Sequence, residues 1–228
     1  VTGVQTCALP IWVLNRVCPE GFEHHIQSIR IVEKLENHGR GLNLTKEVRD
    51  GILNHQTIGK PKTLEGKIVR LADKIAYINH DIDDAIRGHI IQEEDIPSEF
   101  TDILGHSSRE RLNTIIHDII INSEGTGDII MSEKIQQAMF KMRKYMFKSV
   151  YTNPVAKGEE AKAESMVAWL FEYYVKNLEL MPEEFLEMIE EKGETVTRVV
   201  CDYIAGMTDR FAVAKFKELN IPRSWSIY

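Results

Sequence analysis

Cysteine is scarce in this sequence, and it contains no long hydrophobic run. The 228 residues include only three cysteines, Cys7, Cys18 and Cys201, and no two of them have the Cys-x-x-Cys spacing. This usage indicates neither a disulfide framework nor a zinc cluster, and it is typical of the reducing cytoplasm. No apolar run reaches the roughly 18 residues of a membrane-spanning helix, so the sequence predicts no membrane partner.

Positive charge is also in short supply. Lys and Arg number 28 against 35 Asp and Glu, which gives a formal net charge of −7 at pH 7. This excess of negative charge disfavours nucleic acid as a partner, although a local basic groove is compatible with it. The hydrophobic content of 43% is enough for one sizeable domain with a buried core.

Strand patterns are missing, because no segment alternates apolar and polar side chains over several residues. Nearly every periodic segment instead repeats with the period of an α-helix. We therefore expect an all-α fold, with Thr45 and Ser132 as helix caps. The expected helices cover residues 23–37, 45–53, 64–87, 107–123, 132–146, 159–180, 182–192 and 194–219.

The helix expected at residues 64–87 has two distinct sides. Apolar residues recur at alternating steps of four and three and predict one buried stripe, made of Leu64, Ile68, Leu71, Ile75, Ile78, Ile82 and Ala85. At about 100° per residue, Asp73, Tyr77, Asp81 and Asp84 share the opposite side, with Lys74 beside them. Such a side is either solvated surface or the wall of a polar site.

The polar residues of this helix form a known pattern. Asp-Lys-x-x-Tyr-x-x-x-Asp over residues 73–81 resembles the last motif of the HD-domain deoxynucleoside triphosphate triphosphohydrolases, the dGTPase-like family. The resemblance implies that Asp73 is the final metal ligand and that Lys74 contacts the triphosphate. It further implies that Tyr77 packs by the sugar and phosphates, and that Asp81 holds the 3′-hydroxyl. The chemistry fits, since carboxylate oxygen suits a divalent ion and lysine offers a point charge to phosphate.

Two further segments resemble the same family. Residues 21–30 resemble the segment after the family's central His-Asp pair, which implies that His24 donates a proton to the departing group; the alternative is a surface histidine at a helix start. Residues 142–151 resemble a helix that supplies an arginine for phosphate and a tyrosine near the base. The matching residues are Arg143 and Tyr151, and the alternative is a basic solvated helix face. His55 is a further, weaker candidate for the site.

The end of the chain completes the resemblance. Residues 202–212 are similar to the ending of bacterial members of the family. We interpret this segment as helix packing, in which Gly206 permits close approach and Asp209 or Arg210 forms an anchoring salt bridge.

The family's other metal ligands have no match in this sequence. The family signature His-Asp-x-Gly-His does not occur, and the pairs His80-Asp81 and His117-Asp118 lie in the wrong context. Asp73 is then one ligand of the four that the family uses. The resemblance implies a divalent ion (Mn, Mg, Fe or Co) in the intact enzyme, which this chain is not expected to hold by itself.

The expected organisation follows from these matches. Residues 1–11 carry no charge and no helical period, and they look like a translated sequencing adaptor; the alternative is a genuine strand or loop. Residues 12–92 are expected to be the C-terminal part of an HD domain, an HD-domain-like helical bundle remnant. Residues 93–228 are expected to be a helical C-terminal region of the same enzyme.

The function implied by the resemblance is metal-dependent hydrolysis of deoxynucleoside triphosphates, such as dGTP, to a deoxynucleoside and inorganic triphosphate. The resemblance also implies a homo-oligomer, and the cysteine usage predicts a cytoplasmic location. The chain as given is expected to show little or no catalysis. Two alternatives stay open: another HD-type phosphohydrolase, or a non-catalytic helical assembly module that binds nucleotides.

Overall fold

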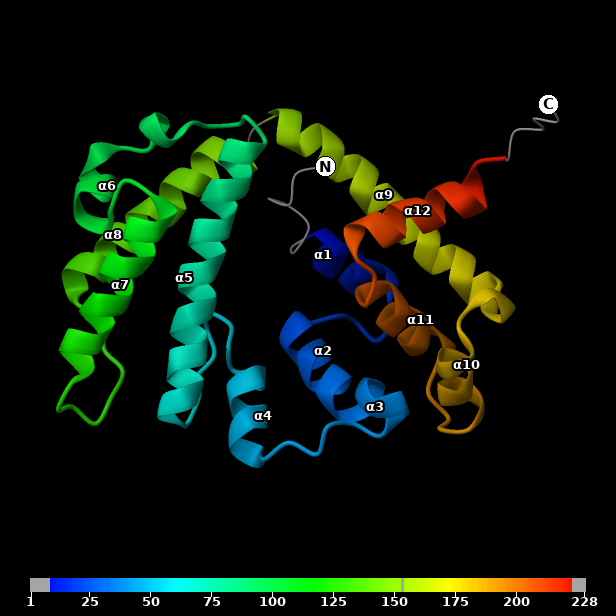
Figure 1. Ribbon diagram of the computed structural model, residues 1–228. Helices are drawn as coiled ribbons and strands as arrows, with labels where there is room; N and C mark the ends of the chain where they lie inside the picture. Colours follow the sequence, from blue (N-terminus) through cyan, green and yellow to red (C-terminus); the bar gives the residue numbers. More distant parts are fainter. Residues whose placement is uncertain (1–8, 153, 223–228) are drawn as a thin grey trace, which may run out of the picture. The chain divides into compact units, whose positions relative to one another are not determined.

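The computed structural model describes residues 9–152 and 154–222, and every regular element in them is helical (Figure 1). The prediction of an all-α fold is therefore confirmed. The α-helices are α1 (Leu9–Val17), α2 (His24–Arg30), α3 (Glu36–Gly39), α4 (Lys46–Leu53), α5 (Leu64–Arg87), α6 (Ser98–Leu104), α7 (Ser108–Ser123), α8 (Glu133–Met146), α9 (Pro154–Lys176), α10 (Glu183–Glu190), α11 (Val196–Ala205) and α12 (Asp209–Asn220). Short π-helical turns follow α2 at Ile31–Leu35 and α8 at Phe147–Tyr151.

Six of the described helices begin at a hydroxyl cap, which is a local signal. A Ser or Thr side chain accepts a hydrogen bond from the backbone N–H three residues later at the start of α4, α5, α7, α8, α11 and α12. The caps predicted at Thr45 and Ser132 are both confirmed. The helix predicted over residues 23–37 is present from His24 to Leu35, as α2 and the π-helical turn that follows it. It ends before Asn37, whose positive φ of 57° a helix does not tolerate.

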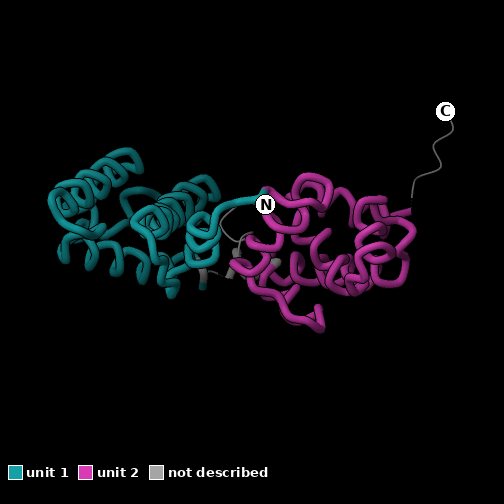
Figure 2. Tube along the Cα trace, turned by 90° about the horizontal axis from the view of Figure 1, so that it is seen from below, with its two compact units in different colours: residues 1–5, 43–158 teal, residues 6–42, 159–228 magenta. Residues whose placement is uncertain are grey.

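The chain forms two compact units (Figure 2). The first contains residues 43–158, and the described part of the second contains residues 9–42 and 159–222. These structural boundaries differ from the division predicted at residue 92. The predicted division separates the HD-domain part from the C-terminal region of the enzyme, which need not coincide with compact units. It stays a prediction.

In the first unit, α5 packs against α4, α7 and α8. Its side chains Ile75, Ile78, Ile82 and Ala85 are buried in one cluster with three methionines of α8, Met139, Met142 and Met146. This confirms the C-terminal part of the predicted apolar stripe. The N-terminal part is wrong, because Leu64 and Ile68 are 42% and 51% exposed.

Polar contacts fix α7 along α5. Arg111 is almost fully buried; its Nε donates to Oδ1 of Asn79 over 3.1 Å, and its guanidinium pairs with Glu93. The Ser108 hydroxyl donates to Asp83 of α5 over 3.1 Å. Because these partners are few and specific, they set the register between the two helices as well as their proximity.

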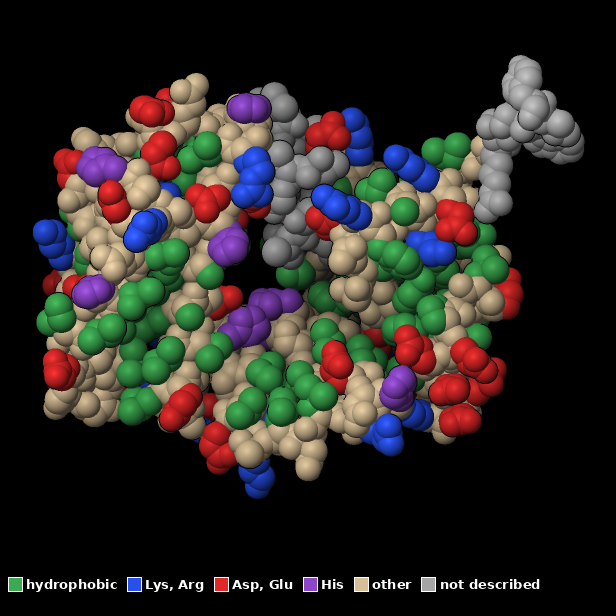
Figure 3. Space-filling view, viewed as in Figure 1, with side chains coloured by type: hydrophobic (Ala, Val, Ile, Leu, Met, Phe, Trp, Pro, Cys, Tyr) green, Lys and Arg blue, Asp and Glu red, His purple; other side chains and the backbone are tan. Residues whose placement is uncertain are grey.

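One side of α7 remains uncovered by the described residues. Leu112, Ile116 and Ile120 follow one another at steps of four and are 36%, 48% and 59% exposed. Figure 3 shows hydrophobic side chains gathered over this helix. Thus α7 buries one stripe against α5 and presents a second one outward.

In the second unit, α1, α9, α10, α11 and α12 contribute to another core. Leu14, Leu170 and Val199 are fully buried there. Aromatic rings of neighbouring helices meet edge to face, such as Tyr174 and Tyr203 with centroids 5.1 Å apart. This core supports α11, whose Asp202 accepts hydrogen bonds from Gln27 and Arg30 at α2.

We expect Ile82→Ala to lower the free energy of unfolding by about 2–5 kcal/mol, because it leaves a cavity at a fully buried position of α5. The matched change Ile120→Ala removes the same atoms from an exposed position of α7 and is expected to cost less than about 0.5 kcal/mol. Denaturant unfolding followed by far-ultraviolet circular dichroism measures both. Equal losses would show that the core assignment is wrong.

Candidate functional site

The predicted site residues of α5 differ in how deeply they are buried. Asp73 is exposed, Lys74 is half-buried and Tyr77 is 40% exposed, whereas Asp81 is only 8% exposed. Tyr77 forms a side-chain hydrogen bond with Asp81, four residues further along. The Oδ2 atom of Asp81 is buried and has no hydrogen-bond partner among the described residues. The four residues therefore lie on one helix side whose C-terminal end is recessed.

Burial changes the titration of Asp81. Loss of water around the carboxylate raises the pKa of Asp81 to about 7, and the nearby negative charge of Asp84 acts in the same direction. The hydrogen bond with Tyr77 and the positive charge of Arg143 oppose this rise. Near neutral pH this carboxyl group can therefore both accept and donate a hydrogen bond.

Helix α8 brings Arg143 to the same region. The arginine is exposed, one residue after the fully buried Met142. Its charge favours the ionised form of Asp81, and it also lowers the pKa of Lys74. The fold therefore brings together three residues that the sequence predicts for one site, although they come from two distant segments. The side chain of Tyr151, the other candidate from that segment, lies outside the described residues.

Arg70 is a further cation that the sequence analysis missed. It precedes Lys74 by one helical turn, and its Nη1 donates to the carbonyl of Gly59 over 2.9 Å. Burial is the largest cause of the lowered pKa of Lys74, followed by the positive charges of Arg70 and Arg143. The i, i+4 spacing of Arg70 and Lys74 was a signal that could have found it.

Three cations of this region, Arg70, Lys74 and Arg143, have no anionic partner within salt-bridge distance in the part of the chain that the structure describes. Like charges that lie close together without neutralisation destabilise one another, and this repulsion adds to burial, the larger cause, in lowering the pKa of Lys74. An anion that approaches this group would relieve the repulsion. The loop held by Arg70 also contains His55, whose Nδ1 lies 2.6 Å from the carbonyl oxygen of Ile52.

A metal site is not formed by the described residues alone. No group of three or more His, Cys, Asp or Glu side chains among them is arranged to hold a metal ion. Asp73 offers one exposed carboxylate, and a single carboxylate does not fit the donor set that a divalent ion requires.

His24 belongs to the second unit. It is the first residue of α2, it is half-buried, and its ring meets that of His25 edge to face at 5.6 Å between centroids. No side chain caps this helix, since the N-cap residue Glu23 makes no such bond. The proton-donating role of His24 stays a prediction.

The comparison with known proteins gives the family. The Phosphohydrolase-associated domain matches residues 129–218, which lie in the predicted C-terminal region. A deoxyguanosinetriphosphate triphosphohydrolase-like protein of Caldanaerobacter subterraneus subsp. tengcongensis is 50% identical over 93% of this chain and 62% of its own length. Proteins of the same name are 44% identical in Clostridium perfringens, over 92% of this chain and 64% of that protein, and 33% identical in Geobacter sulfurreducens, over 92% and 68%.

The chain belongs to the deoxyguanosinetriphosphate triphosphohydrolase-like family. The resemblance read from the motifs is therefore confirmed. The chain spans less than two thirds of the length of the first two of these relatives, at 62% and 64%. No described helix combines the length and the apolar character needed to cross a membrane.

The interpretation of the C-terminal segment needs correction. The anchoring carboxylate is Asp202, which is 2% exposed and pairs with Arg30 and Arg198. Neither of the expected anchors, Asp209 or Arg210, forms an ion pair with a described residue. Gly206 is not needed for close approach either, because a Cβ there would lie 3.5 Å from its nearest neighbour, an ordinary contact.

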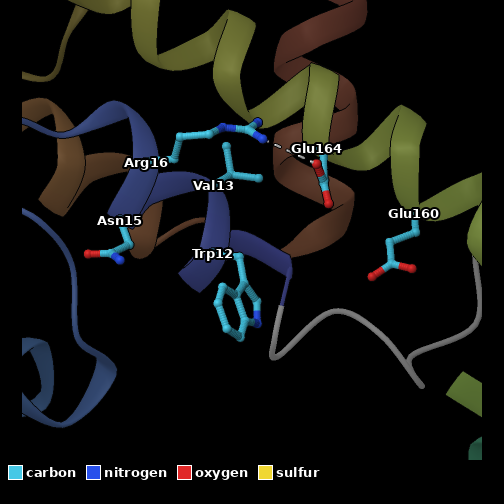
Figure 4. Close-up of a pocket in the computed structure, with 6 residues that line it drawn as sticks. All are labelled: Trp12, Val13, Asn15, Arg16, Glu160 and Glu164. Atoms are coloured by element: carbon cyan, nitrogen blue, oxygen red, sulfur yellow. Dashed lines mark ion pairs between the residues drawn. The ribbon is translucent and has the colours of Figure 1, made fainter.

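A pocket of the second unit lies apart from these residues. Figure 4 shows its lining residues, Trp12, Val13, Asn15, Arg16, Glu160 and Glu164. Arg16 and Glu164 form an ion pair of 3.6 Å across it. None of the predicted site residues lines this pocket.

We expect the stability of the chain to reveal the titration of Asp81. The folded protein keeps this proton up to about pH 7, whereas the unfolded chain loses it near the ordinary value of 3.8, so stability falls as the pH rises through this window. Between pH 5 and pH 8 the free energy of unfolding of the wild type should fall relative to that of Asp81→Asn by about 2–3 kcal/mol. Urea unfolding at both pH values measures the difference, and a constant difference would contradict the assignment.

Proposed function

We propose that this chain is the phosphate- and sugar-binding portion of an enzyme that hydrolyses deoxynucleoside triphosphates to a deoxynucleoside and inorganic triphosphate. The observation that carries the proposal is the convergence of Arg143 from α8 with Lys74 and Asp81 of α5. It joins cations suited to phosphate with a recessed carboxyl group suited to a hydroxyl.

The triphosphate is proposed to bind at the group of cations formed by Arg70, Lys74 and Arg143. Lys74 supplies a point charge, and Arg143 supplies planar donors that fit two phosphate oxygens at once. Arg70 adds positive charge from the next turn of α5 while it holds the loop at Gly59. Binding of the anion removes the repulsion among these groups and returns the pKa of Lys74 toward its ordinary value.

The sugar is proposed to bind at the recessed end of the same side. The free Oδ2 of Asp81 accepts the hydrogen bond of the 3′-hydroxyl, and Tyr77 packs beside the sugar while it orients that carboxyl group. A pocket that is closed at the 2′ position would favour deoxyribose. Tyr151 is proposed to lie near the base.

The reaction is an attack of water on the α-phosphorus with cleavage of the bond to the 5′-oxygen. His24 is proposed to donate its proton to that oxygen, so that the deoxynucleoside leaves as a neutral alcohol. Lys74 and Arg143 stabilise the charge that stays on the triphosphate. HD-type phosphohydrolases generally use divalent metals. We propose that Asp73 contributes one ligand to a Mn, Mg, Fe or Co ion, and that the remaining ligands belong to the part of the relatives that this chain does not span.

The enzyme is further proposed to be a cytoplasmic homo-oligomer. Cys18 and Cys201 are both free thiols in the structure, as expected of a reducing compartment. The alternatives are another HD-type phosphohydrolase and a nucleotide-binding module without turnover. Binding of deoxynucleotides without product formation by the longer protein would favour the binding module.

We expect this chain to bind inorganic triphosphate, and Arg143→Gln to weaken that binding about tenfold or more, since a charge-assisted hydrogen bond to phosphate contributes roughly 1.5–3 kcal/mol. The matched variant is Lys144→Gln, which removes the same charge from the next exposed residue, about 100° around the helix. It should change the affinity by less than about twofold. Isothermal titration calorimetry compares the two, and equal effects would point to non-specific attraction.

We expect Asp73→Ala to abolish hydrolysis in a longer enzyme that carries the upstream family motif, and the chain as given to show little or no turnover. The reason is that removal of one ligand weakens a metal site severely. Release of inorganic triphosphate from dGTP with added Mn²⁺ measures both. The control Glu65→Ala removes another exposed carboxylate of α5 and should retain activity. Turnover by Asp73→Ala would refute the role of Asp73.

A further inference from the structure

Helix α2, which begins at His24, is poorly determined by its own sequence. It has seven residues, no side-chain cap, and a π-helical turn directly after it. Helices of this length are unstable in isolation, because nucleation costs more than so few hydrogen bonds return. The orientation of α2 must therefore come from contacts with the rest of the second unit.

Those contacts converge on one buried carboxylate of α11, that of Asp202. Gln27 donates from Nε2 to its Oδ1 over 2.8 Å. Arg30 donates from Nε to both carboxylate oxygens, over 2.9 Å and 2.7 Å. Because Gln27 and Arg30 lie one turn apart on α2, the two bonds fix both the position and the rotation of this helix about its axis.

Arg198 joins this network and contacts residues on both sides of His24 in the chain. It lies one turn before Asp202 on α11 and pairs with it over 3.1 Å. Its Nη1 donates to the carbonyl of Gly21 over 3.3 Å, and its Nη2 donates to the side chain of Gln27. Its guanidinium also lies 6.0 Å from the ring centroid of Phe22. One side chain thus contacts the residues three before and three after His24.

We propose that Arg198 and Asp202 are positioning residues for His24. This inference rests on the proposed function of His24 as the proton donor, and it adds two residues that act on the reaction through α2 without touching the substrate. A general acid works only within hydrogen-bond reach of its acceptor, so a small rotation of α2 moves the imidazole out of range. The bonds of Arg198 and Asp202 oppose such a rotation.

The rival interpretation is that this network only stabilises the fold. The chain offers a matched control, because Glu194 also pairs with Arg30, over 3.1 Å, and with Lys34, over 2.6 Å. Among the described residues, the hydrogen bonds of the Glu194 side chain go to Arg30 and Lys34 and not to Gly21 or Gln27. Loss of Glu194 therefore removes an ion pair of α2 and leaves the bonds around His24 in place.

The test uses this chain and measures backbone hydrogen exchange of residues 24–30 together with the NMR titration curve of the His24 ring. In Arg198→Ala, backbone exchange of residues 24–30 should accelerate about tenfold or more, while the buried part of α9 around Leu170 (the α9 core) keeps its protection. The His24 titration curve should also shift. Glu194→Gln should change neither by more than about twofold. Asp202→Asn keeps the shape of the side chain and should act like Arg198→Ala.

In the longer enzyme, the same variants should lower kcat with little change in KM and should displace the limb of the pH–rate profile that reports the general acid. Arg198→Lys keeps the positive charge but cannot donate to Gly21 and Gln27 at the same time, so this variant should recover only part of the rate. If the longer enzyme does not hydrolyse deoxynucleotides, the proposed function fails, while the exchange and NMR measurements still decide the positioning of α2.

Three results would overturn the inference. One is unchanged exchange and titration of His24 in Arg198→Ala. Another is an equal effect of Glu194→Gln. The third is equal acceleration of exchange in the α9 core, which would assign the network to global stability; if Arg198→Ala does not fold, Arg198→Lys and Asp202→Asn decide by the same criteria.

Discussion

The packing of α5 against α8 is the contact on which the candidate site depends. Ile75, Ile78 and Ile82 of α5 lie in one buried cluster with methionines of α8, and burial of these chains supplies most of the free energy that holds the two helices together. Since Met142 points into that core, the next residue, Arg143, emerges at its edge and acts on Lys74 and Asp81. An apolar contact thus determines an electrostatic one.

The sequence predicted the features that arise within one helix. The helical class and the caps at Thr45 and Ser132 follow from local rules, and they are confirmed. The pattern of residues 73–81 and the candidate Arg143 came from a family resemblance that the comparisons confirm. The roles of the individual residues stay proposals, because a motif indicates which chemistry is present and not where the partner helix brings its charges.

The features that depend on contacts between helices could not be predicted from the sequence. Burial of Asp81 and exposure of Leu64 and Ile68 depend on how far α8 and α7 cover α5. The periodicity treats all seven apolar positions as equal, whereas coverage differs along the helix. For the same reason, Asp202 was missed as the anchor of α2, since its partners lie more than 170 residues away in the chain. The helix at α2 was predicted from its apolar period, but the contacts of Gln27 and Arg30 that orient it were not.

The most direct test of the account is the pKa of the Lys74 amine, followed by NMR in this chain. Burial holds this pKa below the ordinary value of 10.5, and the positive charges of Arg70 and Arg143 add to the effect. The account predicts that the pKa rises in Arg143→Gln, and that it rises in the wild type when inorganic triphosphate is added, because each change removes positive charge or supplies negative charge beside the amine. A Lys74 pKa that responds to neither change would contradict the assignment of this surface as a phosphate site.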